Sequence, residues 1–250
     1  MSQLSRVHSR RTLNIRRALA LVAGFLIFKV TAVVVWGYRN YLPPNFNSDF
    51  LRGREDYFFG AYQWAFYAHI ASGPFALIAG TLLVSDSFRQ RSPRWHRFVG
   101  RFQVTNVLLV VAPSGLWMAG YAAAGPIAAV GFALMALLTG LCAALGFRAA
   151  VRRRFPVHRR WMWRCYLLLC SAVVLRLLGG FATVVGIRAQ WFDPVAAWAS
   201  WTLPLAIFEL SRWRSARTVG LSTRTSAIAP VHQAMRPAFT HTTGSGRCRR

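Results

Sequence analysis

The sequence predicts an all-α protein: a polytopic bundle of about six transmembrane helices with both termini in the cytoplasm. Three observations support this fold class. Of the 250 residues, 55% are hydrophobic. The apolar residues gather into stretches close to the ~20 residues that span a bilayer. Clusters of arginine separate these stretches, and the charged fraction of 15% is below the ~25% typical of soluble domains.

Six apolar stretches are candidate spans, of which five are strong and the last is weak. They cover residues 18–36, 58–84, 102–121, 127–147, 161–187 and 195–210. The first stretch is long for the core of a signal peptide and lacks a clear cleavage site, so we expect a retained helix. The last stretch is short and contains Pro204.

This division predicts three parts. Residues 1–17 form a basic cytoplasmic N-terminus, residues 18–211 form the transmembrane domain, and residues 212–250 form a basic cytoplasmic tail. The tail contains eight arginines and no acidic residue, and it is rich in serine and threonine. Such a composition is typical of disordered segments.

Arginine distribution predicts the orientation of the helices. The strongly basic segments precede the first helix, join the second to the third and the fourth to the fifth, and follow the sixth. With six spans, all of these segments fall on one side of the membrane. The positive-inside rule makes this side the cytoplasm. We therefore expect a multi-pass membrane protein.

The net charge of +25, from 31 basic and 6 acidic residues, points to anionic partners. Because the arginines lie between apolar stretches, anionic lipid head groups of the bilayer are the expected partner. The sequence has no basic helix or aromatic strand motif of the kind that nucleic-acid-binding proteins use, so no nucleic-acid partner is expected. The scarcity of carboxylates also argues against the usual soluble hydrolases.

Two polar residues lie near the middle of apolar stretches. His69 and Arg176 are each about 11 residues from the outer ends of their helices, which places both roughly 16 Å deep at 1.5 Å per residue. The two side chains can therefore meet near the bilayer midplane. No acidic residue lies in the middle of a span, so Arg176 lacks an obvious carboxylate partner. Buried ionisable residues of this kind predict a functional site, although snorkelling or a packing role for either residue remains an alternative.

Two similar segments precede the third and fifth helices. His96 lies in the first and His158 in the second. Two neutral imidazoles on separate helices can bind haem iron axially, and arginines such as Arg101 and Arg164 can pair with haem propionates. Without a C-x-x-C-H motif, such a haem is of the non-covalent b type. Ordinary interfacial histidines among arginines are the alternative interpretation.

The second helix has a row of small residues and a Gly73–Pro74 pair just after His69. Ala76, Ala79 and Gly80 allow a neighbouring helix to approach closely. Gly73 and Pro74 are expected to loosen the helix and free backbone carbonyls near His69. A ligand cavity at this point and close helix packing are both compatible with the pattern.

Taken together, these motifs resemble a family of bacterial membrane proteins, domain of unknown function 2306. The resemblance covers residues 67–188 and rests on four segments: His69-Ile70-x-x-Gly73-x-x-Ala76-Leu77-x-x-Gly80, His96-Arg97-x-x-Gly100-Arg101, His158-Arg159-Arg160-Trp161-Met162-x-Arg164, and Arg176. The family pattern favours a tyrosine where Gln103 stands, and a Gln-Phe pair where this chain has Leu83-Val84. The resemblance implies a helical bundle, a multi-pass location in the bacterial inner membrane and the positions of a site, without an activity.

Three functional hypotheses follow from these residues. The first is a membrane redox protein that holds b-type haem or a quinone between the second, third and fifth helices, with a membrane redox partner. His96 and His158 are then the expected iron ligands, or His69 with one of them, while Arg176 holds an anionic group or polarises a quinone carbonyl. The second hypothesis is a small-anion transporter with His69 and Arg176 in its pathway. The third is a structural or assembly partner of another membrane complex.

Overall fold

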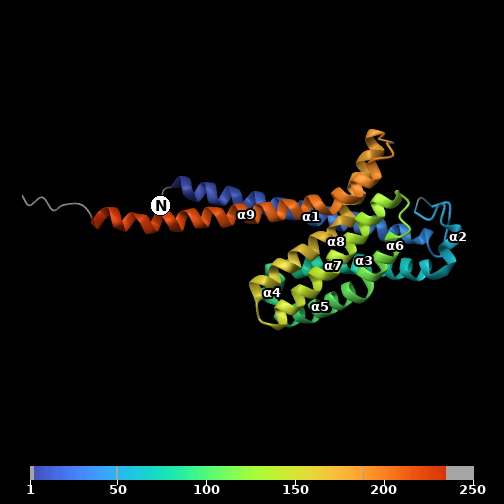
Figure 1. Cartoon of the computed structure of the whole chain (residues 1–250), viewed down its shortest axis with the longest axis horizontal. Coiled ribbons are helices and arrows are strands. Elements are labelled where there is room, and N and C mark those ends of the chain that lie inside the picture. The colour runs from blue at the N-terminus through green and yellow to red at the C-terminus, as the bar shows by residue number, and fades with distance from the viewer. Residues whose placement is uncertain (1–2, 49, 188, 235–250) are drawn as a thin grey trace, which may run out of the picture. The chain divides into compact units, whose positions relative to one another are not determined.

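The computed structural model describes residues 3–48, 50–187 and 189–234, and within them it contains helices and no β-strand (Figure 1). Five helical segments are long and apolar enough to cross a membrane: Leu21–Asn40, Glu55–Val84, Pro93–Ala119, Gly125–Val151 and Phe155–Val185. The prediction of an all-α polytopic bundle is confirmed. The chain divides into two units, Met1–Leu205 and Ala206–Arg250, and the first contains the bundle.

The long helices of the first unit follow the order of the predicted spans. They are α1 (Gln3–Gly37), α3 (Gln63–Val84), α5 (Pro93–Asn106), α6 (Ala112–Ala119), α7 (Gly125–Val151), α8 (Phe155–Val185) and the first part of α9 (Phe192–Ala234). Short elements connect them: η1 (Tyr38–Asn40), α2 (Glu55–Tyr57), η2 (Phe58–Tyr62), α4 (Asp86–Arg91) and η3 (Val107–Val111). The π-helical turn η3 joins α5 to α6, so these elements form a single span.

The helices α5 and α8 begin several residues before the apolar stretches that predicted them. The third and fifth spans were expected from residues 102 and 161, whereas α5 begins at Pro93 and α8 at Phe155. Hydropathy marks only the part of a helix that lies in lipid, and arginine is a good helix former. A proline in the first helical turn, Pro93 or Pro156, suits the start of a helix because its missing N–H is not needed there. The basic segments therefore form the first turns of these helices.

The weak sixth stretch, residues 195–210, is helical but is not among the five candidate spans. It forms the early part of α9, which continues to Ala234. The tail predicted to be disordered is thus helical over residues 212–234, and its remainder lies outside the described residues. Residues 212–229 contain one glycine and no proline, so their composition permits the helix to continue. Residues 3–17 of the predicted N-terminal segment likewise belong to α1.

The two ends of the bundle differ in chemistry. At one end, the Asp86 carboxylate accepts hydrogen bonds from Arg89 at 2.8 Å and from Arg159 at 2.9 Å, which ties α4 to the start of α8. At the other end, the rings of Tyr57 and Tyr121 stack with centroids 4.8 Å apart. The basic connections thus meet at one end, as the arginine pattern requires. Which end faces the cytoplasm stays a prediction.

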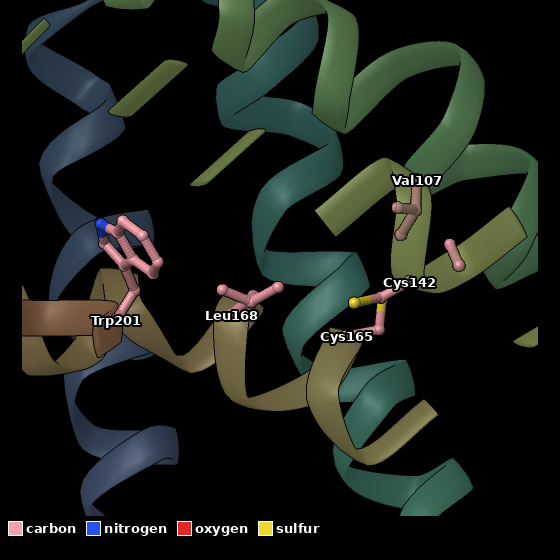
Figure 2. Packing of buried hydrophobic residues seen from close by; sticks show 6 residues of the cluster. Val107, Cys142, Cys165, Leu168 and Trp201 are labelled. Atoms are coloured by element: carbon pink, nitrogen blue, oxygen red, sulfur yellow. The ribbon is translucent and has the colours of Figure 1, made fainter. Parts of the chain in front are cut away.

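The core of the bundle lies where α7 and α8 pack along each other against η3 and α9. Its buried residues include Val107, Cys142, Cys165, Leu168 and Trp201 (Figure 2). Cys142 and Cys165 are free thiols in the core. Small apolar side chains of this kind let two helices come close together, which brings the polar residues of α8 near those of α3 and α1.

Glycines separate into two groups according to their surroundings. A Cβ added to Gly80 would lie 2.9 Å from Cδ2 of Tyr166, so Gly80 admits the tyrosine ring, in keeping with close packing. Gly73 has nothing within 4 Å of such a Cβ. Close packing therefore does not account for Gly73, which instead lines a cavity.

The indole of Trp198 provides a test of this packing. A Cβ added to Gly131 would lie 2.9 Å from its Nε1, which donates to the Ile127 carbonyl at 3.0 Å. We expect Gly131→Ala to lower the free energy of unfolding by about 1–3 kcal/mol, because a rigid ring must shift. SDS unfolding of the purified protein measures this change. The control, Gly180→Ala, has open space at its Cβ and should be neutral or up to about 1 kcal/mol more stable. Equal losses in the two variants would contradict the packing.

Candidate functional site

A cavity of about 630 Å³ lies inside the first unit, between α1, α3, α6, α7, α8 and the start of α9. Its walls are largely apolar, and a small number of polar side chains face it. His69 of α3 and Arg176 of α8 both line this cavity. The structure therefore brings together the two polar residues that the sequence placed at the same depth.

A proline inside the continuous helix α3, Pro74, lines the cavity close to His69. Pro74 has no N–H to donate to the carbonyl of Ile70, four residues earlier, so this carbonyl needs another donor. The hydroxyl of Tyr38 donates to it at 2.6 Å. Freed backbone groups near His69 were expected from the Gly73–Pro74 pair. The Tyr38 hydroxyl of η1, which donates to one of these groups, was not expected from the sequence.

The orientation of the His69 ring follows from its neighbours. Nδ1 lies 3.0 Å from the hydroxyl oxygen of Ser114 on α6, and that hydroxyl donates its own proton to the Val110 carbonyl. Ser114 therefore accepts from His69, and we assign the Nδ1–H tautomer. Nε2 is left with its lone pair available. Gly115 makes room for the ring, because a Cβ there would lie 3.3 Å from Cε1 of His69.

Arg176 lines the cavity without a carboxylate partner. Its Nη1 donates to the Ala172 carbonyl at 3.0 Å, and none of the ion pairs between described residues involves it. The guanidinium interacts electrostatically with Tyr38, Tyr41 and His69. Part of the side chain is exposed. Most of its donors thus stay available for an acceptor inside the cavity.

Aromatic side chains line part of the cavity wall. Leu51, Phe58, Tyr62 and Phe66 form a buried cluster there, and the Tyr62 and Phe66 rings also line the cavity. Tyr41 packs edge-on against Phe66 with ring centroids 5.2 Å apart. Stacked and edge-on rings stabilise one another. The segment between α1 and α3 is thereby held over the cavity.

Arg54 fixes this aromatic segment to the turn between α6 and α7. Its guanidinium donates to the carbonyl of Phe50 at 2.7 Å, to the hydroxyl of Tyr57 at 2.9 Å and to the carbonyl of Tyr121 at 2.9 Å. The side chain is 8% exposed and also lies 4.7 Å from the centre of the Phe50 ring. All of these contacts are within the protein. Arg54 therefore holds in place the segment between α1 and α3, which we call the aromatic cap.

The other two histidines of the predicted site, His96 and His158, lie at the basic end and do not line the cavity. Nδ1 of His158 donates to the Gly146 carbonyl at 2.8 Å. His96 lies close enough to His158 for the two to interact electrostatically. Its Nδ1 is buried and has no hydrogen-bond partner among the described residues. The six predicted site residues therefore separate into two groups.

Arg101 and Arg164 also lie outside the cavity wall. Arg101 is exposed, and the Arg164 guanidinium lies 4.6 Å from the centre of the Trp161 ring. Across the described part of the chain, no group of three or more His, Cys, Asp and Glu side chains is placed to hold a metal ion. A haem needs only two axial histidines, so the absence of a three-residue group does not test the His96–His158 pair. Haem binding by this pair stays a prediction.

Several cavity residues were missed by the sequence reasoning. The reasoning also missed Ser114, which is the hydrogen-bond partner of His69 and not a residue of the cavity wall. It is a polar residue in a largely apolar part of its span, and that signal was available in the sequence. Tyr38, Arg54 and Asp193 lie outside the predicted spans, and they reach the cavity through folding of the connecting segments. No local pattern marks such residues.

Replacement of Arg54 tests the attachment of the cap. Arg54→Met should lower the free energy of unfolding by about 1.5–3 kcal/mol, because it removes charged hydrogen bonds and leaves two carbonyls without a donor. Thermal unfolding in detergent measures the change. Arg52→Met, at an exposed arginine of the same segment, should stay within about 0.5 kcal/mol of the native protein. If both variants unfold like the native protein, Arg54 does not stabilise the cap.

One family model matches the chain. It is described as "Predicted membrane protein (DUF2306)", and it covers residues 66–211, more than half of the 250 residues. The matched region contains His69, His96, His158 and Arg176. No curated protein and no solved structure matches the chain. With five helices able to cross a membrane and this match, the chain belongs to the DUF2306 family of predicted membrane proteins.

Proposed function

We propose that the protein is a membrane redox protein whose cavity binds the head group of a quinone. The observation that carries this proposal is that His69 and Arg176 line one cavity while Arg176 has no carboxylate partner. A quinone ring presents two carbonyl oxygens, which accept hydrogen bonds. Arg176 donates to one carbonyl and polarises it. The lone pair of His69 Nε2 accepts a hydrogen bond from the hydroxyl that forms when the quinone is reduced to the quinol.

The size and walls of the cavity suit this class of ligand. Its volume of about 630 Å³ falls within the ~300–1,000 Å³ typical of small-molecule sites. Aromatic rings such as Tyr41 and Phe66 offer faces for a planar head group. The apolar walls offer a place for an isoprenoid tail. Mobile quinones of this kind occur in the bacterial inner membrane, where we place the protein.

A b-type haem fits the cavity less well than a quinone. His69 is the one histidine among the described residues of its wall, whereas two axial imidazoles are expected of a low-spin b haem. A haem between His96 and His158, with its propionates on Arg101 and Arg164, is a second proposal. It is favoured by the Nδ1–H bond of His158 to Gly146, because that bond leaves Nε2 free as a ligand.

A spectrum separates the two cofactors. The reduced-minus-oxidised absorbance spectrum of the purified protein shows a Soret shift and an α-band if haem is bound by this pair, and neither if the protein holds only a quinone. The quinone proposal expects neither band. A haem spectrum lost in both His96→Ala and His158→Ala would instead establish the haem site.

Quinone binding itself is tested by titration with decylubiquinone, which is followed by quenching of tryptophan fluorescence. We expect saturable binding that Arg176→Gln weakens about tenfold to a hundredfold, because a charged hydrogen bond contributes about 1.5–3 kcal/mol. Arg94→Gln is the matched control, since Arg94 is an exposed arginine away from the cavity wall. It should bind as tightly as the native protein.

Two results would overturn the quinone proposal. One is the absence of saturable binding, and the other is an equal loss of affinity in Arg176→Gln and Arg94→Gln. Arg176-dependent uptake of a small anion into liposomes, without quinone binding, would support the anion transporter. A stable protein partner that co-purifies with a His69→Ala variant of unchanged phenotype would support an assembly role.

A further inference from the structure

Two polar atoms without partners lie on one face of α5. Oε1 of Gln103 and Nδ1 of His96 are buried, and neither has a hydrogen-bond partner among the described residues. The two residues are seven positions apart, which is two helical turns and about 10 Å. Gln103 itself is 2% exposed. Both atoms therefore face the interior of the bundle on the same stripe of the helix.

The Gln103 amide lies where three helices meet. Its Nε2 donates to the Ala76 carbonyl of α3 at 2.9 Å. A Cβ built on Gly80 of α3 would lie 2.9 Å from the Tyr166 ring of α8 and 3.9 Å from this Nε2. The Tyr166 hydroxyl is already engaged with Thr81 at 3.0 Å. The protein thus satisfies one half of the amide and leaves the carbonyl oxygen unpaired.

Polar groups continue from Gln103 to the cavity. Asn106, one turn further along α5, donates from Nδ2 to the Ser72 carbonyl at 3.4 Å. Ser72 donates to the Ala68 carbonyl at 2.6 Å and lies one turn from His69. His96, Gln103, Asn106, Ser72 and His69 therefore form a polar row, which runs from the basic end of the bundle to the cavity.

Leaving a buried acceptor unsatisfied costs about 1–3 kcal/mol. Lipid offers it no hydrogen-bond donor, so the donor must come from inside the protein. Buried water is the usual partner of such groups in protein interiors. Ionisable side chains inside membrane-spanning bundles, histidine among them, mark proton relays, and a histidine stands at each end of this row. Both considerations apply to the row between His96 and His69.

We propose that a file of buried water molecules binds along this polar row, with Gln103 Oε1 as its central acceptor. The file gives protons a route between the basic end of the bundle and the cavity. Each water accepts a proton from one neighbour and passes another to the next, so only O–H bonds break and form. The destination of these protons, though not the water file itself, rests on the proposed quinone site.

Hydroxyl-radical footprinting with X-ray pulses tests the water file in the full-length protein, because radicals form at bound water and label the nearest side chains. Tyr166 is 9% exposed and lies beside Gln103, whereas Phe58 is 0% exposed in the aromatic cluster. We expect Tyr166 to be labelled severalfold faster than Phe58. Labelling of Tyr166 as slow as that of Phe58 would show that the row is dry, and would overturn the proposal.

Gln103→Leu tests whether the amide holds the water. Leucine has a similar size and no acceptor, so labelling of Tyr166 should fall severalfold, towards the rate of Phe58. Thr105→Val, at an exposed position of the same helix, should leave it unchanged. An unchanged rate in a folded Gln103→Leu protein would also overturn the proposal. If leucine prevents folding, Gln103→Met provides a flexible replacement that lacks the amide.

The proton route is tested by reduction of bound decylubiquinone with dithionite in a stopped-flow experiment. Dithionite supplies two electrons, and the file supplies two protons, so that both C=O groups become C–OH. At equal quinone occupancy, Gln103→Leu should slow quinol formation severalfold while the Kd of the quinone stays unchanged. Equal rates would overturn the proton route. If no quinone binds, the quinone proposal fails, and the footprint alone decides on the water file.

Discussion

Hydrogen-bonding groups inside a membrane-spanning bundle must find their partners within the protein, since lipid offers none. The hydrogen bond from Tyr38 to the Ile70 carbonyl shows how much of this structure depends on that constraint. Pro74 creates the need for a donor, and Tyr38 of η1, directly after α1, supplies it. The bond fixes α1 against α3 at the depth of His69, and it brings the phenol of Tyr38 within electrostatic range of Arg176.

The cavity differs from the rest of the bundle because its polar groups are only partly satisfied. Ser114 fixes one nitrogen of His69 and leaves the other available. Arg176 uses one donor on its own helix. Removing a cation from water is costly unless a partner compensates. A ligand with acceptor oxygens would provide such compensation, and this supports our proposal that the cavity binds one.

In the aromatic cap, by contrast, the buried arginine is fully bonded to groups of the protein. Arg54 is buried, and its guanidinium donates hydrogen bonds to two carbonyls and a hydroxyl of the protein. Two arginines near the same cavity thus have different roles, because one is fully engaged by protein groups and the other is not. At the basic end, His96 and His158 form a separate group, and the polar row of α5 and α3 lies between that group and the cavity.

The membrane-spanning helices, the alternation of basic ends and the common depth of His69 and Arg176 could all be predicted from the sequence alone. These features depend on composition and on the fixed rise of a helix, which act locally. Hydropathy could not reveal that the basic turns belong to the helices, nor that α9 would continue as far as Ala234. The contacts of Tyr38 with Ile70 and of Arg54 with Tyr121 could be seen only in the folded protein. The same holds for the position of His96 and His158 outside the cavity wall. Those contacts join segments far apart in the chain, and their geometry depends on how the helices pack.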